Sequence, residues 1–221
     1  ERAAITRLKL TSQFRCNGSD AYLSWLNSSL QIQETANDDL PPSEYDFRIC
    51  DDPNELRSEI SHLNQDRNKA RLVAGYCWPW NSKKTPAAYD VVIGRNFKMK
   101  WNLTSDGSGW IIQPNSVEQI GCIHTCQGLE VDYIGVVIGP DLVVKDGQIL
   151  TDGLKRARSD QSMKGFKSWL KEDSKSAKAE ADLVIKNTYR TLMTRGARGC
   201  LIYSEDAETR DYFRKALKGN S

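Results

Sequence analysis

The chain lacks the features that would assign it directly to a metal enzyme, a membrane protein or a strongly basic nucleic-acid binder. Its 221 residues include only two histidines, and the formal net charge is +2. No apolar run approaches the roughly 18 residues that a membrane-spanning helix needs. Because the overall charge is close to zero, any surface for nucleic acid has to be local. We therefore expect a globular protein with no membrane partner and no metal site.

Six cysteines allow two interpretations of the environment in which the protein works. No CxxC pair or Cys/His metal spacing occurs, and most of the cysteines lie in or beside apolar segments, where a thiol packs as a small hydrophobic group. We expect a reduced, cytoplasmic protein. The alternative is a secreted, disulfide-linked glycoprotein, since sequons begin at Asn17, Asn27 and Asn102. The chain starts at Glu1 without an initiator methionine or an apolar leader, and we expect it to be a piece of a longer protein.

Apolar periodicity predicts strands and helices that alternate along most of the chain. We expect helices at about 19–30, 52–69, 177–193 and 208–217, and strands at 7–10, 47–50, 71–76, 120–123, 133–138 and 200–203. Residues 143–150 predict a β-hairpin centred on Asp146-Gly147. This alternation is typical of an α/β fold, in which helices flank a mainly parallel sheet.

Two segments fit this alternation less well. Residues 77–116 contain four tryptophans among prolines, glycines and lysines, and we expect a loop-rich insertion with short strands. Its lysines suit a surface that follows a nucleic-acid strand, with tryptophans stacking on bases; the alternative is a lysine-covered loop over a tryptophan core. These residues are Lys83, Lys84, Lys98 and Lys100 with Trp78, Trp80 and Trp101. Residues 153–176 are polar and basic, and we expect mobility around a short helix near Trp169.

The segment HTCQGLEVDYIGVVIG, at residues 124–139, places a glycine and a carboxylate just before an apolar strand. Gly128 would let a ligand approach the backbone closely. Glu130 is suited to accept hydrogen bonds from both hydroxyls of a ribose. The alternative is an ordinary turn glycine beside a solvated glutamate.

The segment NTYRTLMTRGARGCLIY, at residues 187–203, puts Arg195 and Arg198 around two glycines before another apolar strand. Guanidinium groups bind phosphate oxygens in paired hydrogen bonds. Helix capping is the alternative, with arginine near the negative end of the helix and glycine just after it. Arg15, between a predicted strand and a predicted helix, is a third candidate, although an isolated arginine there is usually a surface residue.

Taken in order, QFRC, HTCQGLEVDY and TYRTLMTRGARG resemble the C-terminal motifs of superfamily 1 helicases and translocases. They are most similar to those of the schlafen-type helicase-like domain, and the resemblance runs from residue 8 to about residue 213. It implies that residues 1–221 form one domain, the second of two RecA-like domains that hold ATP in the cleft between them. Single-stranded DNA or RNA is the partner that the resemblance implies.

The resemblance also implies roles for residues at the nucleotide. Arg15 corresponds to an arginine that reaches the γ-phosphate. Arg195 corresponds to the arginine finger, which stabilises charge during phosphoryl transfer. Glu130 would bind the ATP ribose, and Gly128 would let the backbone approach it. Arg198 is an additional cation, either a second phosphate ligand or a helix cap.

Two further positions correspond to residues that touch the nucleic-acid strand or couple it to the nucleotide. They are His124 and Thr125. Gln127 is a further candidate contact of the nucleotide. It stands where related helicases usually carry a lysine, so it has no charge with which to make the contact of that lysine.

The chain has no GxxxxGK[ST] phosphate loop and no acidic Mg²⁺-binding motif after a strand. In the family both belong to the first RecA-like domain. Without them a triphosphate is not held in line for attack. We expect ATP and Mg²⁺ to bind in the full-length protein, and the isolated chain neither to bind ATP tightly nor to hydrolyse it. The expected function is the C-terminal motor half of a helicase or translocase. The alternative is a regulatory module that senses nucleotide or a partner without unwinding.

Overall fold

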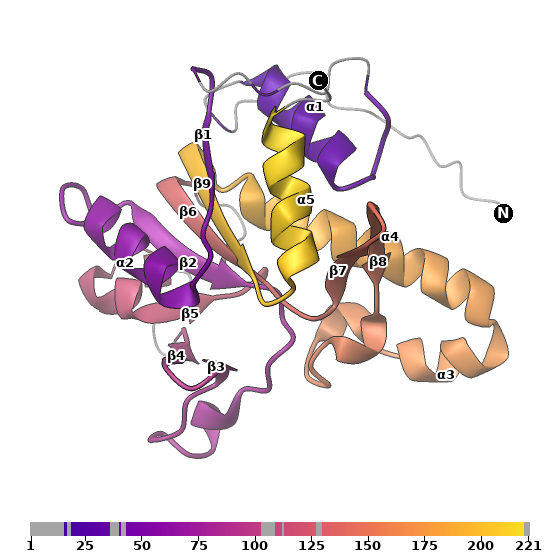
Figure 1. Cartoon of the computed structure of the whole chain (residues 1–221). Coiled ribbons are helices and arrows are strands. Elements are labelled where there is room, and N and C mark those ends of the chain that lie inside the picture. The colour runs from indigo at the N-terminus through magenta and orange to yellow at the C-terminus, as the bar shows by residue number, and fades with distance from the viewer. Residues whose placement is uncertain are drawn as a thin grey trace, which may run out of the picture.

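Figure 1 shows the computed structural model of the chain. The residues that it describes are 16, 19–35, 40, 43–102, 109–111, 113–126 and 130–218. The strand expected at 7–10 and the candidate residues Arg15, Gln127 and Gly128 lie outside these ranges.

Seven of the nine described strands form one sheet, in the order β1-β9-β6-β2-β5-β4-β3. Every neighbouring pair is parallel except β3 and β4. The strands are β1 (Asp46–Ile49), β2 (Ala70–Ala74), β3 (Val91–Ile93), β4 (Phe97–Trp101), β5 (Gln119–Gly121), β6 (Val131–Ile138) and β9 (Gly196–Ser204). The predicted α/β class with a mainly parallel sheet is confirmed. The tryptophan-containing segment 77–116 contributes β3 and β4, which extend this sheet.

Helices cover both faces of the sheet. The helix α2 (Pro53–Asn64) packs on one face, and α1 (Asp20–Ser29), α4 (Ser174–Met193) and α5 (Ala207–Lys218) pack on the other. The short helix α3 (Phe166–Glu172) contains Trp169 and packs against α4. Single turns of 3₁₀ helix are η2 (Asn81–Lys83), η4 (Pro114–Glu118), η5 (Gly153–Lys155) and η6 (Gln161–Met163).

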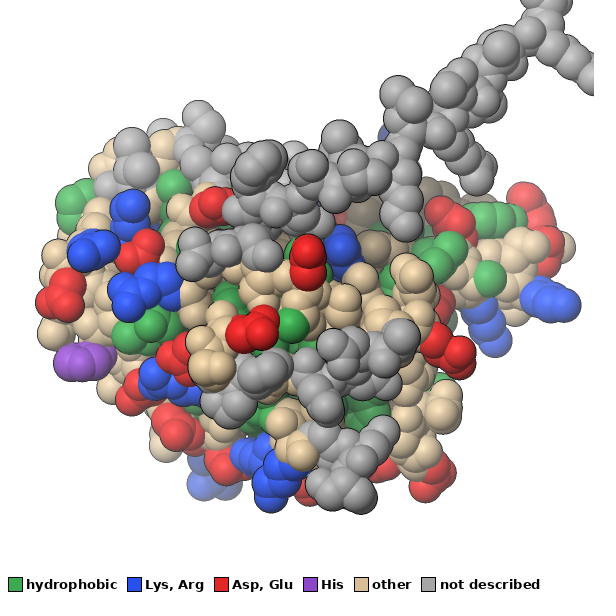
Figure 2. All heavy atoms as spheres, turned by 90° about the horizontal axis from the view of Figure 1, so that it is seen from above, with side chains coloured by type: hydrophobic (Ala, Val, Ile, Leu, Met, Phe, Trp, Pro, Cys, Tyr) green, Lys and Arg blue, Asp and Glu red, His purple; other side chains and the backbone are tan. Residues whose placement is uncertain are grey.

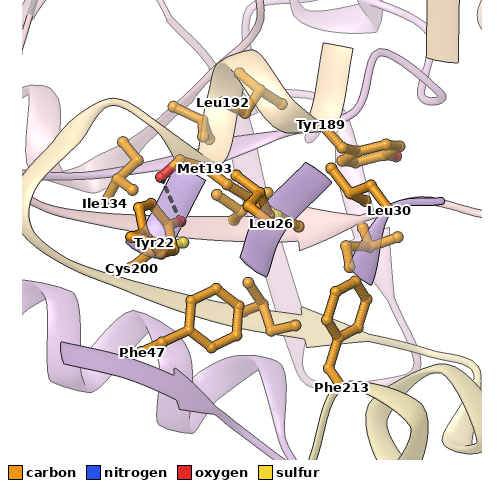
Figure 3. Packing of buried hydrophobic residues seen from close by; sticks show 14 of the residues in the cluster. Tyr22, Leu26, Leu30, Phe47, Ile134, Tyr189, Leu192, Met193, Cys200 and Phe213 are labelled. Atoms are coloured by element: carbon orange, nitrogen blue, oxygen red, sulfur yellow. Dashed lines mark hydrogen bonds between the residues drawn. The ribbon is translucent and has the colours of Figure 1, made fainter. Parts of the chain in front are cut away.

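The two central strands are apolar on both faces, as parallel strands between two helical layers must be. Along β6, Ile134 and Val136 belong to the core under α1, α4 and α5, while Val137 faces α2. In β9, Cys200 and Leu201 divide between the two faces in the same way. Figure 3 shows the first of these cores, where α1 places Tyr22, Leu26 and Leu30 among residues of the sheet and α4.

Local signals in the sequence account for several element boundaries. The Asp52 carboxylate caps α2, the helix expected from residue 52, by accepting hydrogen bonds from the amides of Asn54 and Glu55. The predicted hairpin consists of β7 (Leu142–Lys145) and β8 (Gln148–Thr151). Its two turn residues, Asp146 and Gly147, have φ of 51° and 74°, which fits a type I′ turn.

The cysteine thiols and the sequon asparagines test the alternative of a secreted glycoprotein. All six cysteines are free, and five of them are buried. Asn102 is only 7% exposed, and its side-chain oxygen accepts a hydrogen bond from Thr125. A glycan on that amide would require the local structure to open. None of the helices in the described part of the chain is long and apolar enough to cross a membrane.

Because the central strands are parallel, the sheet has an N-terminal edge, where they begin, and a C-terminal edge, where they end. In Figure 1 the N-terminal edge is uppermost, near α1, and the C-terminal edge is below. Each of the two candidate segments includes the start of a strand, β6 or β9, at the N-terminal edge.

Candidate functional site

The second and third motifs meet at the N-terminal edge. The Val131 amide donates a hydrogen bond of 3.0 Å to the Arg195 carbonyl oxygen, and Val131 pairs with Gly196 in the β6–β9 ladder. Glu130 and Arg195 therefore occupy neighbouring positions, although 65 positions separate them in sequence (195 − 130). The Glu130 side chain is exposed, as a ligand-binding carboxylate requires. Figure 2 views the molecule from this side, where acidic and basic side chains are interspersed.

The first motif reaches the same turn through its last residue. The Cys16 thiol donates to the Thr194 carbonyl oxygen at 3.6 Å, and Thr194 immediately precedes Arg195. Arg15 itself is outside the described residues, so its implied role at the γ-phosphate stays a prediction. Cys16, its neighbour in sequence, lies at the N-terminal edge.

Two stacked tyrosines hold the turn between α4 and β9. The Tyr22 hydroxyl donates to the Met193 carbonyl oxygen at 2.9 Å, a bond drawn in Figure 3. The Tyr45 hydroxyl donates to the Gly196 carbonyl oxygen at 2.8 Å. The ring centroids of Tyr22 and Tyr45 are 3.7 Å apart. The backbone on both sides of Arg195 is thus fixed by hydrogen bonds from buried side chains.

The guanidinium of Arg195 lies near the Cys126 thiol of the second motif. Burial raises the pKa of Cys126 to about 12, and the positive charge of Arg195 acts in the opposite direction. Cys126 is 1% exposed and Arg195 is 4% exposed. The arginine side chain is therefore enclosed at this edge, where its charge would be screened less than at the surface.

The two glycines of the third motif permit close approach between strands. A Cβ on Gly196 would lie 2.0 Å from the Gly199 carbonyl oxygen, and a Cβ on Gly199 would lie 2.7 Å from the Asp46 carbonyl oxygen. Among the described glycines, positive φ occurs at Gly94, Gly147 and Gly165. Gly196 thus does not end α4 in a left-handed cap, and the capping interpretation of this glycine is wrong. Thr194 caps the helix instead, and its amide bonds to carbonyl oxygens within the last turn.

Arg198 lies over the ring of Tyr133 in β6. It lies within β9, is exposed, and places its guanidinium carbon 5.6 Å from the centre of the Tyr133 ring. The helix-cap alternative for Arg198 is therefore wrong. Its other predicted role, as a second phosphate ligand, stays a prediction.

The second motif connects the two edges of the sheet. Gly121, the last residue of β5, pairs with Val73, which pairs on its other side with Val136. The chain must then return to Val131, five strand positions or roughly 17 Å away at about 3.3 Å per residue. The segment between β5 and β6 therefore begins at the C-terminal edge and ends at the N-terminal edge beside Arg195.

His124 and Thr125, the predicted nucleic-acid contacts, lie near the start of this crossing. The Thr125 hydroxyl donates to the Asn102 side chain at 2.9 Å and accepts from the Cys122 amide at 3.1 Å. His124 is exposed and lies edge-on to Tyr76, with ring centroids 6.1 Å apart. Its Nε2 is 3.8 Å from the buried carboxylate of Asp160.

A buried ion-pair network lies beneath His124. Arg156 binds Asp141 at 3.0 Å and Asp160 at 2.7 Å, and all three side chains are fully buried. Burial alone would lower the pKa of Arg156, but the two carboxylates raise it overall. The Tyr189 hydroxyl, from α4, donates to Asp141 at 2.5 Å. The helix that leads to Arg195 is thereby bonded to the residues around His124.

Comparison with known proteins identifies the family. Residues 1–206 match the family described as Schlafen group 3, DNA/RNA helicase domain. The chain belongs to this family. It is also 25% identical over 222 residues to the uncharacterized protein YPL245W of Saccharomyces cerevisiae (strain ATCC 204508 / S288c). That alignment covers 91% of this chain and 46% of the yeast protein, so the chain spans about half the length of this relative. No solved structure matches.

In this schlafen helicase domain, one of the predicted tryptophan contacts, Trp101, is a core residue. Trp101 and Trp110 are fully buried, and the Trp101 indole donates to the Trp78 carbonyl oxygen. Lys98 is exposed on β4, and the Lys100 ammonium donates to the Pro86 carbonyl oxygen. The predicted role of these two lysines in nucleic-acid binding stays a prediction.

Sequence reasoning missed the ion-pair network of this helicase domain. Arg156 lies in a segment expected to be polar and mobile, and Asp141 follows a Gly-Pro turn signal. The residues around each of these two positions are those typical of a charged side chain exposed to solvent. The spacing of Arg156 and Asp160, four residues apart, is the one signal that was available.

The donor set at the N-terminal edge fits part of a nucleotide. A guanidinium suits a phosphate group and a carboxylate suits ribose hydroxyls, and Arg195 and Glu130 supply both at neighbouring positions. Within the described ranges, no group of three or more His, Cys, Asp or Glu side chains is arranged to hold a metal ion.

Proposed function

We propose that this schlafen helicase domain is the C-terminal motor half of a cytoplasmic, ATP-dependent helicase or translocase. Its N-terminal edge would face ATP and Mg²⁺ held by a first RecA-like domain of the same protein. The observation that carries the proposal is the junction of Val131 with Arg195, which puts Glu130 and Arg195 at one edge. The family, described as a DNA/RNA helicase domain, supports nucleic acid as the other partner.

The roles proposed for this chain are positioning and charge stabilisation. Bound ATP would supply the phosphoryl group and the free energy of its hydrolysis. Arg195 would stabilise negative charge on the phosphate oxygens, and Arg15 would hold the γ-phosphate. Glu130 would accept hydrogen bonds from the ribose, with Gly128 allowing the approach. An arginine placed in this way is worth about 10³–10⁵ in rate in related nucleotide hydrolases.

The course of the second motif supports coupling between nucleotide and nucleic acid. One end of the motif carries His124 at the C-terminal edge, and the other end carries Glu130 at the N-terminal edge. A shift at one end of the motif would be transmitted through the chain to the other end. The bond from Tyr189 to Asp141 provides a second connection, through α4.

A second candidate is a regulatory module that senses nucleotide or a partner without unwinding. The burial of Arg195 favours this second candidate. Its side chain is only 4% exposed, so the guanidinium would have to move toward the phosphates when the first domain docks, and such a movement suits a sensor of nucleotide. The substitution of glutamine for lysine at position 127 also favours it.

Phosphate release from ATP separates the two candidates. The full-length protein and the isolated chain are each incubated with ATP and Mg²⁺, with and without single-stranded oligonucleotide. We expect turnover by the full-length protein, stimulated by the oligonucleotide, and none above background by the chain. Hydrolysis by the isolated chain would mean that it contains a complete site. No turnover by the full-length protein under any condition would favour the regulatory module.

A further inference from the structure

A basic groove of about 1070 Å³ lies at the C-terminal edge. One wall is the loop after β2, and the other is formed by η5, the residues that follow it and the start of α3. Both segments lie in the lower part of Figure 1. Five exposed cations line the groove: Lys83, Lys84, Lys155, Arg158 and Lys167. Among the described residues that line it, none carries a carboxylate.

This concentration of positive charge is local. The whole chain has 31 basic and 29 acidic residues, so a groove with five exposed cations and no acid departs sharply from the average surface. Cations that line one concave surface raise the local concentration of a polyanion. A small metabolite would need more specific polar contacts than a row of mobile lysines provides.

The walls of the groove are joined by hydrogen bonds. The Ala157 amide donates to the Tyr76 carbonyl oxygen at 2.9 Å, and the Ser159 hydroxyl donates to the Tyr76 hydroxyl at 3.2 Å. The buried Arg156, paired with Asp141 and Asp160, anchors the second wall from below. The groove is therefore formed before a ligand binds, which reduces the entropic cost of binding.

An aromatic ring lies within the groove. Trp80 is half-buried, and the Lys83 ammonium lies 3.7 Å from its ring centroid. If Lys83 turned toward a phosphate group, this face of the indole would be free to stack on an unpaired base. Cations beside an aromatic ring are the combination with which proteins bind single strands irrespective of sequence.

The groove is continuous with the predicted nucleic-acid contact at His124. Tyr76 lines the groove and meets the His124 ring edge-on. Asp160, which lies 3.8 Å from His124, follows directly after the groove residues 158 and 159. A strand lying in the groove would therefore pass beside the start of the second motif.

We propose that this groove binds the phosphate backbone of a single-stranded polynucleotide, with Lys83, Lys84, Arg158 and Lys167 as phosphate contacts. The proposal deepens the proposed function, because it locates the nucleic-acid path at the edge opposite Arg195. A strand there would act on the nucleotide edge through the second motif.

The test is oligonucleotide binding by the full-length protein without nucleotide. Fluorescence anisotropy of labelled 15-mers of deoxythymidine and of uridine gives the Kd at several salt concentrations. Two double variants each remove two charges from one wall: Lys83→Gln with Lys84→Gln, and Arg158→Gln with Lys167→Gln. The matched control is Lys215→Gln with Lys218→Gln, which removes two exposed charges from α5.

The slope of log Kd against log salt concentration measures the number of phosphate contacts, at about 0.7 per contact for a single strand. Each groove variant removes two cations, so we expect this slope to fall by about 1.4. At about 0.1 M salt this corresponds to a roughly 10- to 30-fold weaker Kd. The control variant should bind within about twofold of the wild type. All the substituted side chains are exposed, so unchanged melting temperatures will verify the fold.

Three results would overturn the proposal. The first is wild-type affinity in both groove variants, or an equal loss in the control. The second is equally tight binding of a 15-base-pair duplex, which would assign the groove to double strands. The third is complete displacement of the oligonucleotide by a polyglutamate peptide at equal total charge, which would assign the groove to an acidic protein.

This outcome is separable from that of the proposed function. Loss of oligonucleotide affinity in the groove variants, in a protein with no ATP turnover, would retain the groove and reject the motor. Wild-type affinity in those variants, together with turnover that depends on Arg195, would retain the motor and reject the groove.

Discussion

The Val131 amide donates a hydrogen bond to the Arg195 carbonyl oxygen, and this 3.0 Å contact joins two motifs that are distant in sequence. Tyr22, Tyr45 and Cys16 bond to the backbone on either side of the same arginine. The position of Arg195 is thus set by the α4–β9 turn, which is fixed from several directions. These bonds fix the backbone of Arg195, whereas its guanidinium, enclosed near Cys126, would have to move to reach a phosphate.

Gly196→Ala should be strongly destabilising. The added Cβ would lie 2.0 Å from the Gly199 carbonyl oxygen and 3.1 Å from the Ile134 amide nitrogen, and backbone atoms cannot move aside easily. We expect a loss of at least about 1–3 kcal/mol in the free energy of unfolding, the usual cost of overpacking. Gly109→Ala is the control, since the nearest side-chain or backbone atom of the described residues there, Gln113 Nε2, is 3.9 Å away. Urea denaturation showing equal stability for both variants would contradict the packing that we describe.

Arg156→Met should also destabilise the domain, because it leaves the carboxylates of Asp141 and Asp160 buried without their cation. Removing one partner of a buried ion pair typically costs about 3–5 kcal/mol. Lys145→Met serves as the comparison, since the ion pairs that it breaks, with Asp206 and Glu208, are exposed and contribute little to stability. Guanidinium denaturation measures both losses. If Arg156→Met costs no more than Lys145→Met, the network does not anchor this part of the fold.

The buried thiol of Cys126 should make stability depend on pH above about 9. Its pKa is raised from 9.0 to about 12, first by burial, so the folded state holds the proton more tightly than the unfolded chain. The contribution is fully present below pH 9 and is lost as the pH rises toward 12. By pH 10 the loss is about 1 kcal/mol. Urea denaturation at pH 7 and pH 10 should show a smaller decrease for Cys126→Ala than for the wild type. An identical decrease would contradict the assignment.

The sequence predicted the central fold because its strands are apolar on both faces and its helices carry recognisable ends. The Asp52 cap and the Asp146-Gly147 turn are local signals, and both appear where they were expected. The helix predicted from residue 52 to 69 ends earlier, at Asn64. The Asn64 side-chain oxygen instead accepts hydrogen bonds from the Ala70 amide and the Arg71 guanidinium. These contacts form only once β2 is in the sheet, so the sequence pattern does not predict them.

The candidate site was predictable in part. The motifs identified Glu130 and Arg195, but their adjacency depends on the pairing of β6 with β9, which spacing in the sequence does not reveal. The basic groove was not predicted, because its two walls are about 70 residues apart in sequence and each alone has the composition of a solvated loop. Lys83 and Lys84 were singled out, whereas Arg158 and Lys167 were not.

The central claim is that Arg195 acts on the phosphoryl group of ATP, and the most direct test is the kcat of Arg195→Ala in the full-length protein. Arg95→Ala, which removes an exposed arginine from the β3–β4 turn, is the matched control. A finger arginine interacts most strongly with charge in the transition state, so its loss falls mainly on kcat. We expect kcat to fall by orders of magnitude with little change in ATP affinity, whereas Glu130→Ala should chiefly weaken ATP binding. Turnover by Arg195→Ala equal to that of Arg95→Ala would contradict the account and leave Arg195 with a purely structural role in the α4–β9 turn.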